Sequence, residues 1–436
     1  MQEKIKLLPL LLLYILYILL ASKDLASENA LTFNVAEPRY AMFANNLSHG
    51  YYLPRDDIEP EYPEVRLFQV SVLNREDIYL WSGPGYPIVL LPFVLLRMPW
   101  LPARLLNAFF LFGAILYFYC TLRFYMSERP SLYFSSLLGV YPPFFARLHL
   151  LLTETLTVFL ICGFMFHFCK LSQNKKGSWT RLLMAGFFLG YLALTKILFG
   201  YVIITSLTVS LLLYAWKRTD RFKRAVWVCC FALLTCLPYL FYTYSLTGKV
   251  FYWANSGGMS LYWMSTPYEG EFGDWFKRDE VERNPSLAAN HKSFFDYVSR
   301  LPSIQRDEAF TQQAIRNIFN NPKKFVVNWV ANCGRLLFNY PYSYTPQKLS
   351  TYAYIIPDMF VVVMMVLSIY PTWIGRRLIP YEVFFLIGFA TIAFGGSSLL
   401  SAYQRFFMPL VPIFCLWIFL TLTRVLRIEM HQQAIP

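Results

Sequence analysis

Long apolar stretches alternate with short, mostly basic connections along the whole chain. A helix that crosses a membrane needs about 20 predominantly apolar residues, within a range of roughly 17–25. Stretches of about this length predict membrane helices over 5–21, 103–121, 131–146, 149–169, 182–196, 198–215, 224–245, 352–371, 380–395 and 404–423. With one shorter stretch, they predict an all-α, polytopic transmembrane helical bundle of about 10–11 membrane segments. We expect it to form a single membrane-embedded domain over residues 1–436.

The shorter apolar stretch covers residues 86–98 and is closed by prolines. We expect the basic N-terminus and the basic connection 170–181 to share one side of the membrane, with residues 22–85 on the other. The chain must then cross an odd number of times between residues 86 and 170, yet four apolar stretches lie there. We therefore predict that 86–98 is a half-helix or re-entrant element, shielded by protein or by a wet cavity.

Two long loops, residues 22–85 and 246–350, are more polar than the rest of the chain. In the first loop, apolar residues that share one helical face predict an amphipathic helix lying on the membrane and ending near Gly50. These residues are Tyr40, Phe43, Ala44 and Leu47.

The second loop contains two further helical patterns. Phe310, Ala314 and Ile318 form a stripe with a spacing of four residues, which is typical of one face of a helix. Residues 325–338, which follow Pro322, carry a polar line. This line consists of Asn328, Asn332 and Arg335. The segment is too short and too polar on one face to cross a membrane, so we predict an interfacial helix.

Composition and charge support a membrane protein. The chain is 56% hydrophobic and only 15% charged, with mean hydropathy +0.40, whereas soluble domains carry about 25% charged residues. Much of the net charge of +13 gathers in the connections 170–181, 217–224, 376–377 and 424–427. This distribution indicates the positive-inside pattern rather than a nucleic-acid-binding surface. We expect both termini to be cytoplasmic, both long loops to be non-cytoplasmic, and the membrane to be a bacterial inner membrane.

Targeting and cofactor signals are sparse. The first apolar stretch follows Lys4 and Lys6 and shows no convincing cleavage site before Ser22, so we interpret it as a retained signal anchor. The eight cysteines and five histidines show no metal-ligand spacing and no disulfide framework. Walker and dinucleotide-binding motifs are absent from the sequence. We predict no cofactor; a divalent metal is compatible with the chain but not indicated.

Glu37 is a candidate for acid–base chemistry. It lies at the start of the predicted loop helix, where a carboxylate at a membrane surface could act as a general base on an acceptor hydroxyl or amine. The alternative is structural, because Asn34 and Glu37 have the spacing of a capping box and Pro38 marks a helix start.

Glu154 stands at the head of an apolar stretch. A charged group at the bilayer centre costs ~3 kcal/mol on insertion scales, so this position indicates a polar cavity. The alternative is a position at the membrane interface, where the cost is small.

Lys196 and Arg405 adjoin apolar stretches on the side away from the basic connections. This placement runs against the positive-inside bias and favours an anionic partner, because guanidinium groups match phosphate oxygens well. The alternative is that both side chains snorkel to lipid headgroups. A further motif, Gly83-Pro84-Gly85-Tyr86-Pro87, could shape the floor of a cavity, although glycine and proline interrupt any loop end.

Several short motifs follow one another along the chain. They are Glu37-Pro38-Arg39-Tyr40-Ala41, Gly85-Tyr86-Pro87, Thr153-Glu154, Leu194-Thr195-Lys196, residues 255–262, residues 314–318 with Asn321-Pro322, and residues 404–409. Each is loose, but their order and shared side of the membrane are more specific. Together they resemble the GT-C superfamily of membrane glycosyltransferases, near the protein O-mannosyltransferases and lipid A aminoarabinose transferases.

The resemblance implies an integral membrane glycosyltransferase that moves a hexose or pentose from a polyprenyl-phosphate sugar to a lipid, glycan or protein acceptor on the non-cytoplasmic face. By this resemblance, Glu37 is the catalytic acid–base residue and Lys196 and Arg405 bind the lipid phosphate. Arg39, Tyr40 and Glu154 are implied as further substrate-binding residues. No nucleic-acid partner is implied.

One departure from the family pattern matters. The family commonly has an Asp-Glu pair where this chain has Ala36-Glu37. Three alternatives follow: Glu37 serves alone, another loop acid such as Asp56 or Asp57 substitutes, or activity has been lost.

Two other functions share this predicted topology. A lipid or solute transporter also needs many helices and buried charges, although the sequence shows no inverted repeat of the kind many transporters have. A polysaccharide polymerase or ligase of the cell envelope would share the lipid-linked donor.

Overall fold

The computed structural model describes residues 8–23, 31, 36–60, 62–173, 178–344 and 349–426. Every regular element in these ranges is helical. The elements that precede the second long loop are α2 (Leu8–Ala21), α3 (Glu37–Ser48), α4 (Pro63–Leu73), α5 (Gly85–Leu95), α6 (Trp100–Leu122), α7 (Glu128–Gly139), α8 (Glu154–Gln173), α9 (Trp179–Thr195), α10 (Leu198–Lys217) and α11 (Asp220–Thr247). The loop and the C-terminal part contain α12 (Gly257–Met264), α13 (Arg278–Arg283), α14 (Pro285–Val298), α15 (Ser303–Asn320), α16 (Pro322–Phe338), α17 (Leu349–Ile374), α18 (Tyr381–Ser398) and α19 (Val411–Leu420).

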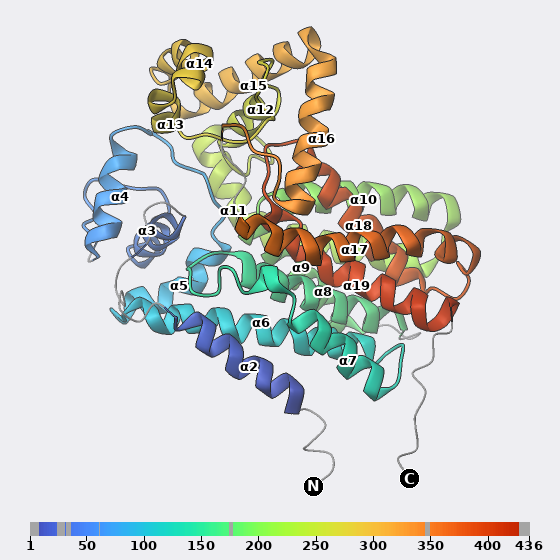
Figure 1. Cartoon of the computed structure of the whole chain (residues 1–436). Coiled ribbons are helices and arrows are strands. Elements are labelled where there is room, and N and C mark those ends of the chain that lie inside the picture. Colours follow the sequence, from blue (N-terminus) through green and yellow to red (C-terminus); the bar gives the residue numbers. More distant parts are fainter. Residues whose placement is uncertain are drawn as a thin grey trace.

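The long helices lie alongside one another and run across the view in Figure 1, while α12–α15 form a cap at the upper left. Within the described residues, seven helices are long and apolar enough to cross a membrane, and α2, α5 and α9 are shorter apolar helices. The chain is therefore a multi-pass membrane protein, and the predicted all-α transmembrane bundle is confirmed.

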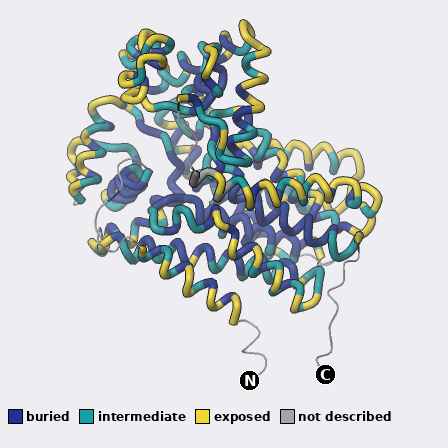
Figure 2. The backbone as a smooth tube through the Cα atoms, viewed as in Figure 1, coloured by how far each residue is buried: buried dark blue, intermediate teal, exposed yellow. Residues whose placement is uncertain are grey.

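Burial differs sharply between the membrane helices (Figure 2). In α8, 78% of the most apolar window is buried inside the protein, against 22% in α17. Since both helices are strongly apolar, α8 forms the centre of the bundle and α17 presents most of its surface outward. Outward-facing apolar surface on this scale is what lipid tails cover in a membrane protein.

One predicted membrane helix in the N-terminal half of the chain needs correction. The stretch 131–146 is not one helix: α7 ends at Gly139, and a 3-10 turn, η2 (Pro142–Phe144), follows. The Tyr17 hydroxyl donates to the Gly139 carbonyl, and a Cβ on Gly139 would lie 2.5 Å from Leu13. Helix α2 thus packs closely against the end of α7, and the two prolines that follow cannot donate the helical hydrogen bonds that would extend it.

The short element 86–98 and the first loop helix are present, with one change. Helix α5 is only 11 residues long, and its re-entrant course stays a prediction. The predicted amphipathic helix corresponds to α3, but its apolar face packs against protein instead of pointing outward. Tyr40, Phe43 and Ala44 are buried inside the protein because α3 packs against α4 and α5.

The second loop is confirmed as helical. In its helix α16, the polar face is turned toward the protein interior. Its polar line, Asn328, Asn332 and Arg335, is completely buried, whereas Val327 and Val330 are more than half exposed. The asparagine amides donate to backbone carbonyls of residues 264, 266, 398 and 400. The polar side chains therefore hold neighbouring segments in place, and the apolar face of α16 points outward.

Candidate functional site

Glu37 is the first residue of α3 and is completely buried. Its carboxylate accepts a hydrogen bond from the backbone N–H of Leu151 at 2.7 Å. The Arg104 guanidinium lies 3.8 Å away. Asn34, the partner in the alternative capping box, lies outside the described residues. The observed contacts tie Glu37 to α6 and to the segment before α8.

Glu154 is the first residue of α8 and meets both predicted phosphate-binding cations. Its carboxylate lies 3.7 Å from the Lys196 ammonium and 4.0 Å from the Arg405 guanidinium. Lys196 also donates to the backbone carbonyl of Arg405 at 3.2 Å. The structure thus brings together three residues that are far apart in the sequence and that the motifs had singled out.

Arg147 adds a third positive charge to this group, which we call the cationic cluster: Glu154, Lys196, Arg405 and Arg147. It interacts electrostatically with both Glu154 and Lys196. The cluster therefore holds three cations and one carboxylate. The Arg405 side chain is 31% exposed, while that of Glu154 is only 4% exposed. Positive charge is in excess, and part of it is accessible.

One side chain, Asn107, fixes the segment that connects the Glu37 contact to the start of α8. Asn107 on α6 donates to the carbonyls of Leu148 and Leu150 and accepts from the Thr155 hydroxyl. These bonds position the Leu151 N–H that binds Glu37 and the start of α8 that carries Glu154. Buried polar groups satisfied in this way hold a single arrangement.

The glycines of the Gly83-Pro84-Gly85 motif allow close backbone packing. A Cβ on Gly83 would lie 2.1 Å from the Leu194 carbonyl oxygen, and one on Gly85 would lie 2.4 Å from the Thr195 hydroxyl. The Tyr191 hydroxyl also donates to the Gly85 carbonyl at 2.8 Å. The motif therefore forms a wall beside the residues that lead directly into Lys196.

Tyr86, the next residue, is a neighbour that the two acids share. It is almost completely buried and interacts electrostatically with Glu37, Glu154 and Arg104. Its hydroxyl and the second carboxylate oxygen of Glu154 have no hydrogen-bond partner in the part of the chain that the structure describes. Buried polar atoms are nearly always satisfied in folded proteins, so a water molecule or ligand is expected there.

Arg39 and Tyr40, predicted to bind substrate, lie in α3 beside Glu37. The Arg39 guanidinium stands over the Tyr40 ring at 5.5 Å, and Tyr40 packs edge-on against Tyr86 at 5.3 Å. Burial would lower the pKa of Arg39, but interactions with Tyr79 and Tyr40 outweigh it and raise this pKa. Tyr40 thus packs against Tyr86, which interacts with both acids. The Arg39 guanidinium interacts with Tyr40 and Tyr79 instead.

Asp56 and Asp57, the possible substitutes for the missing aspartate, are exposed. Asp57 forms a bidentate pair with Arg55 at 2.8 Å, and this hydrogen bonding lowers the pKa of its carboxyl group. Such a pair is typical of a protein surface. Their geometry does not single out either residue as a base.

Sequence reasoning missed Arg104, Arg147 and Asp358. Asp358 is completely buried in α17 and accepts hydrogen bonds from Tyr141 and from Gln404, the neighbour of Arg405. Arg104 and Asp358 each stand inside a predicted membrane stretch, and charged residues there usually have a functional partner. A charge inside an apolar stretch was therefore the sequence signal that could have identified Arg104 and Asp358.

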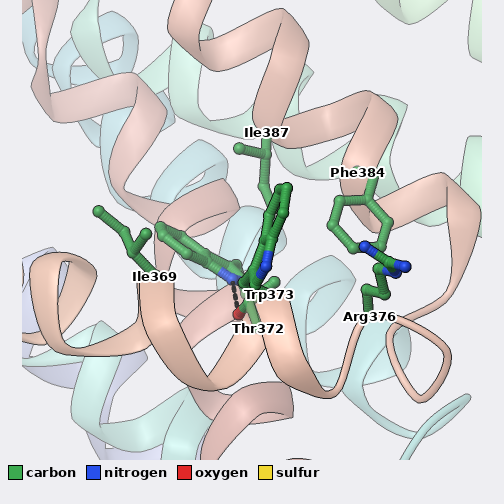
Figure 3. A pocket seen from close by; sticks show the side chains of 7 residues that line it. Ile369, Thr372, Trp373, Arg376, Phe384 and Ile387 are labelled. Carbon is green, nitrogen blue, oxygen red and sulfur yellow. Dashed lines mark hydrogen bonds between the residues drawn. The ribbon is translucent and has the colours of Figure 1, made fainter.

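Metal ligands and cavities do not coincide with the acids. Across the described ranges, no group of three or more His, Cys, Asp or Glu residues could hold a metal ion. A cavity of about 460 Å³ lies between α17, α18 and α19 (Figure 3), and Glu37 and Glu154 do not line it. The cationic cluster can bind an anion, and Glu37, which interacts with Tyr86 as Glu154 does, can offer a carboxylate.

Comparison with known structures identifies the fold. The chain is similar to the archaeal oligosaccharyltransferase AglB from Archaeoglobus fulgidus in complex with an inhibitory peptide and a dolichol-phosphate, with TM-score 0.50 and 14% identity. The match covers 95% of this chain and 50% of that chain. The same enzyme tethered to an acceptor peptide gives TM-score 0.51, again at 14% identity, covering 95% of this chain and 49% of that chain.

A more distant likeness is to ArnT from Cupriavidus metallidurans bound to undecaprenyl phosphate, with TM-score 0.40, 15% identity, and coverage of 97% of this chain and 78% of that chain. No family model matches the chain. No curated protein matches it in sequence. The chain thus spans about half the length of the oligosaccharyltransferase, a GT-C enzyme, and the GT-C resemblance is confirmed as a likeness of fold.

Proposed function

We propose that this chain, which has the fold of the GT-C membrane glycosyltransferases, transfers a glycosyl group from a lipid-linked phosphate donor to an acceptor. The observation that carries the proposal is the excess of positive charge in the cationic cluster. Lys196 and Arg405 lie within 4.0 Å of a single carboxylate, Glu154, at the head of a membrane helix, and Arg147 interacts with it electrostatically. These cations are partly buried, and charged groups inside a membrane protein are costly, so an excess of them is best explained by an anionic ligand.

The donor phosphate would occupy the accessible side of this cluster. Arg405 offers planar N–H donors to phosphate oxygens and Lys196 offers a compact charge. Glu154 keeps both cations in place when no ligand is bound. The structure of AglB contains a dolichol-phosphate, and a polyprenyl phosphate of that chemical class would suit the cluster here.

Glu37 is the proposed general base. The acceptor oxygen or nitrogen attacks the anomeric carbon, the bond from that carbon to the phosphate oxygen breaks, and the phosphate leaves with its electron pair. The Glu37 carboxylate takes the acceptor proton. Because this carboxylate is fully buried and bound to the Leu151 N–H, the role requires the acceptor to displace that N–H or to reach the second oxygen.

The donor assay decides between this reaction and the two other functions. Purified protein is incubated with a polyprenyl-phosphate sugar and, separately, with a polyprenyl-diphosphate glycan. We expect glycosyl transfer from the monophosphate donor. Transfer from the diphosphate glycan alone would instead indicate a polymerase or ligase. Binding of donor with translocation but without bond cleavage would indicate a transporter and overturn the proposal.

A further inference from the structure

The turn between α17 and α18 is flanked by two cavities of opposite character. The first has a volume of about 460 Å³ and an almost wholly apolar lining (Figure 3). Its lining residues are Ile369, Thr372, Trp373, Arg376, Phe384, Ile387 and Trp417. Two of the polar groups in this lining are bonded to each other, since the Trp417 indole N–H donates to the Thr372 hydroxyl at 2.8 Å, and the Arg376 guanidinium lies over the Trp373 ring. The cavity therefore suits a hydrocarbon chain.

The second cavity, of about 240 Å³, is polar. It is lined by Ser172, Arg221, Arg377, Ile379, Pro380, Tyr381 and Glu382. Two guanidinium groups face one carboxylate, and that carboxylate already accepts a hydrogen bond from Tyr125 at 2.8 Å. Positive charge is again in excess, and here both arginines are exposed.

Both cavities are lined by residues at the turn between α17 and α18. Arg376 and Arg377 are consecutive and line one cavity each, and Tyr381 and Phe384 lie one turn apart on α18 and do the same. The apolar cavity opens outward, since Ile369 and Trp373 are 58% and 71% exposed. An occupant that enters both cavities must have an apolar chain facing the bilayer and an anionic group at the helix ends.

We propose that these cavities together bind an anionic diacyl phospholipid. One acyl chain lies in the groove between α17, α18 and α19, and the phosphate lies between Arg221 and Arg377, with Arg376 beside it. The choice of an anionic lipid follows from three guanidinium groups against one carboxylate that is already hydrogen-bonded. The proposal does not depend on glycosyl transfer.

Native mass spectrometry of the full chain in detergent tests the site. Phosphatidylglycerol and phosphatidylcholine with identical acyl chains are titrated separately, and we expect one tightly retained phosphatidylglycerol. Basic residues near a membrane surface each contribute about fivefold to binding of an anionic lipid. The double variant Arg221→Ala with Arg377→Ala should therefore lose about 30-fold in affinity, whereas Lys223→Ala, an exposed neighbour on α11 that lines neither cavity, should bind like the parent.

Two further binding measurements separate the contribution of the acyl-chain groove from that of the phosphate site. Dihexanoyl phosphatidylglycerol, whose chains are too short to fill the groove, should bind more weakly than the long-chain lipid, and inorganic phosphate should not compete at equal concentration. Equal retention of phosphatidylcholine, or equal losses in the double variant and in Lys223→Ala, would each overturn the proposal.

Discussion

Both ends of the helical bundle carry clusters of cations, but the two clusters differ in their exposure to solvent. Helix α8 joins the ends: Glu154 begins it, and Ser172, near its last residue, lines the polar cavity beside Arg221. At a rise of 1.5 Å per residue, these two residues lie about 27 Å apart along the helix. One end encloses its cations around a buried acid, while the other leaves its arginines exposed.

The difference separates two uses of positive charge in a membrane protein. Exposed cations at helix ends are cheap and orient the chain or contact lipid headgroups. Enclosed cations require compensation, and Lys196 with its side chain 10% exposed has Glu154 as its carboxylate partner. A cation that is both enclosed and incompletely neutralised, as in the cationic cluster, is the stronger indication of a ligand site.

The largest expected effect tests whether the two ends lie on opposite sides of the membrane. In a background without the other cysteines, Cys333 and a cysteine at Ser48 should react with an impermeant thiol reagent from outside intact cells. A cysteine at Ser172 should react only after the cells are opened, because it lies at the basic end. Labelling of the Ser172 position in intact cells would contradict the predicted orientation of both ends.

The next effect concerns Glu37. General-base assistance contributes about 10²–10⁴-fold in rate, so Glu37→Gln should lose that much turnover while still accepting the Leu151 hydrogen bond through its amide oxygen. The measurement is initial rate at saturating donor, alongside donor affinity, which should be nearly unchanged.

The Arg104 contact at 3.8 Å calls for a matched control, because breaking a buried ion pair on one side destabilises a protein by about 3–5 kcal/mol. The double variant Glu37→Gln with Arg104→Gln removes both charges. If Glu37 is the base, the double variant remains inactive although its thermal stability recovers. Recovery of turnover in the double variant would assign Glu37 a structural role, and Asp56 and Asp57 would be tested next.

A smaller effect is expected for the cations of the cluster. A hydrogen bond to a charged group contributes about 1.5–3 kcal/mol, so Lys196→Ala or Arg405→Ala should weaken donor binding about tenfold or more. Lys223→Ala, at the opposite end, is the matched control and should bind donor like the parent. Unchanged donor affinity in both cluster variants would leave snorkelling to lipid headgroups as their role.

Most of the helices could be predicted from the sequence because apolar length is a local property of the chain. Pro142 and Pro143 mark the break inside 131–146, but the close approach of α2 to Gly139 could not be predicted, since it depends on tertiary packing. The orientation of α16 could not either: a polar line shows that two faces differ, but only packing decides that Asn328 and Asn332 point inward.

The individual residues of the candidate site could be predicted from the sequence, but the contacts between them could not. The resemblance to a known family singled out Glu154, Lys196 and Arg405 as substrate-binding residues, and the structure brings them together. Their convergence depends on tertiary contacts between distant segments, which no local pattern contains. Arg104 and Asp358 were missed although each is a charge inside an apolar stretch, a signal that the sequence did offer.

The smallest expected effect tests the wall beside the cationic cluster. Gly85→Ala adds a methyl group that would lie 2.4 Å from the Thr195 hydroxyl and 2.7 Å from its backbone nitrogen, so the segment leading to Lys196 must shift. Overpacking of this kind typically costs about 1–3 kcal/mol. We expect a lower melting temperature and weaker donor binding together, because the same displacement moves Lys196.

Gly257→Ala is the control, since a Cβ there meets nothing within 4 Å and the same loss of backbone freedom in the unfolded chain applies to both substitutions. The comparison therefore isolates the close contact at Gly85. If Gly85→Ala and Gly257→Ala have the same melting temperature and the same donor affinity, the Gly83-Pro84-Gly85 segment can shift without moving Lys196. The enclosed end of the bundle would then be held by Asn107 and by the Glu154 ion pairs rather than by backbone packing, and Asn107→Ala would be the variant that loosens it.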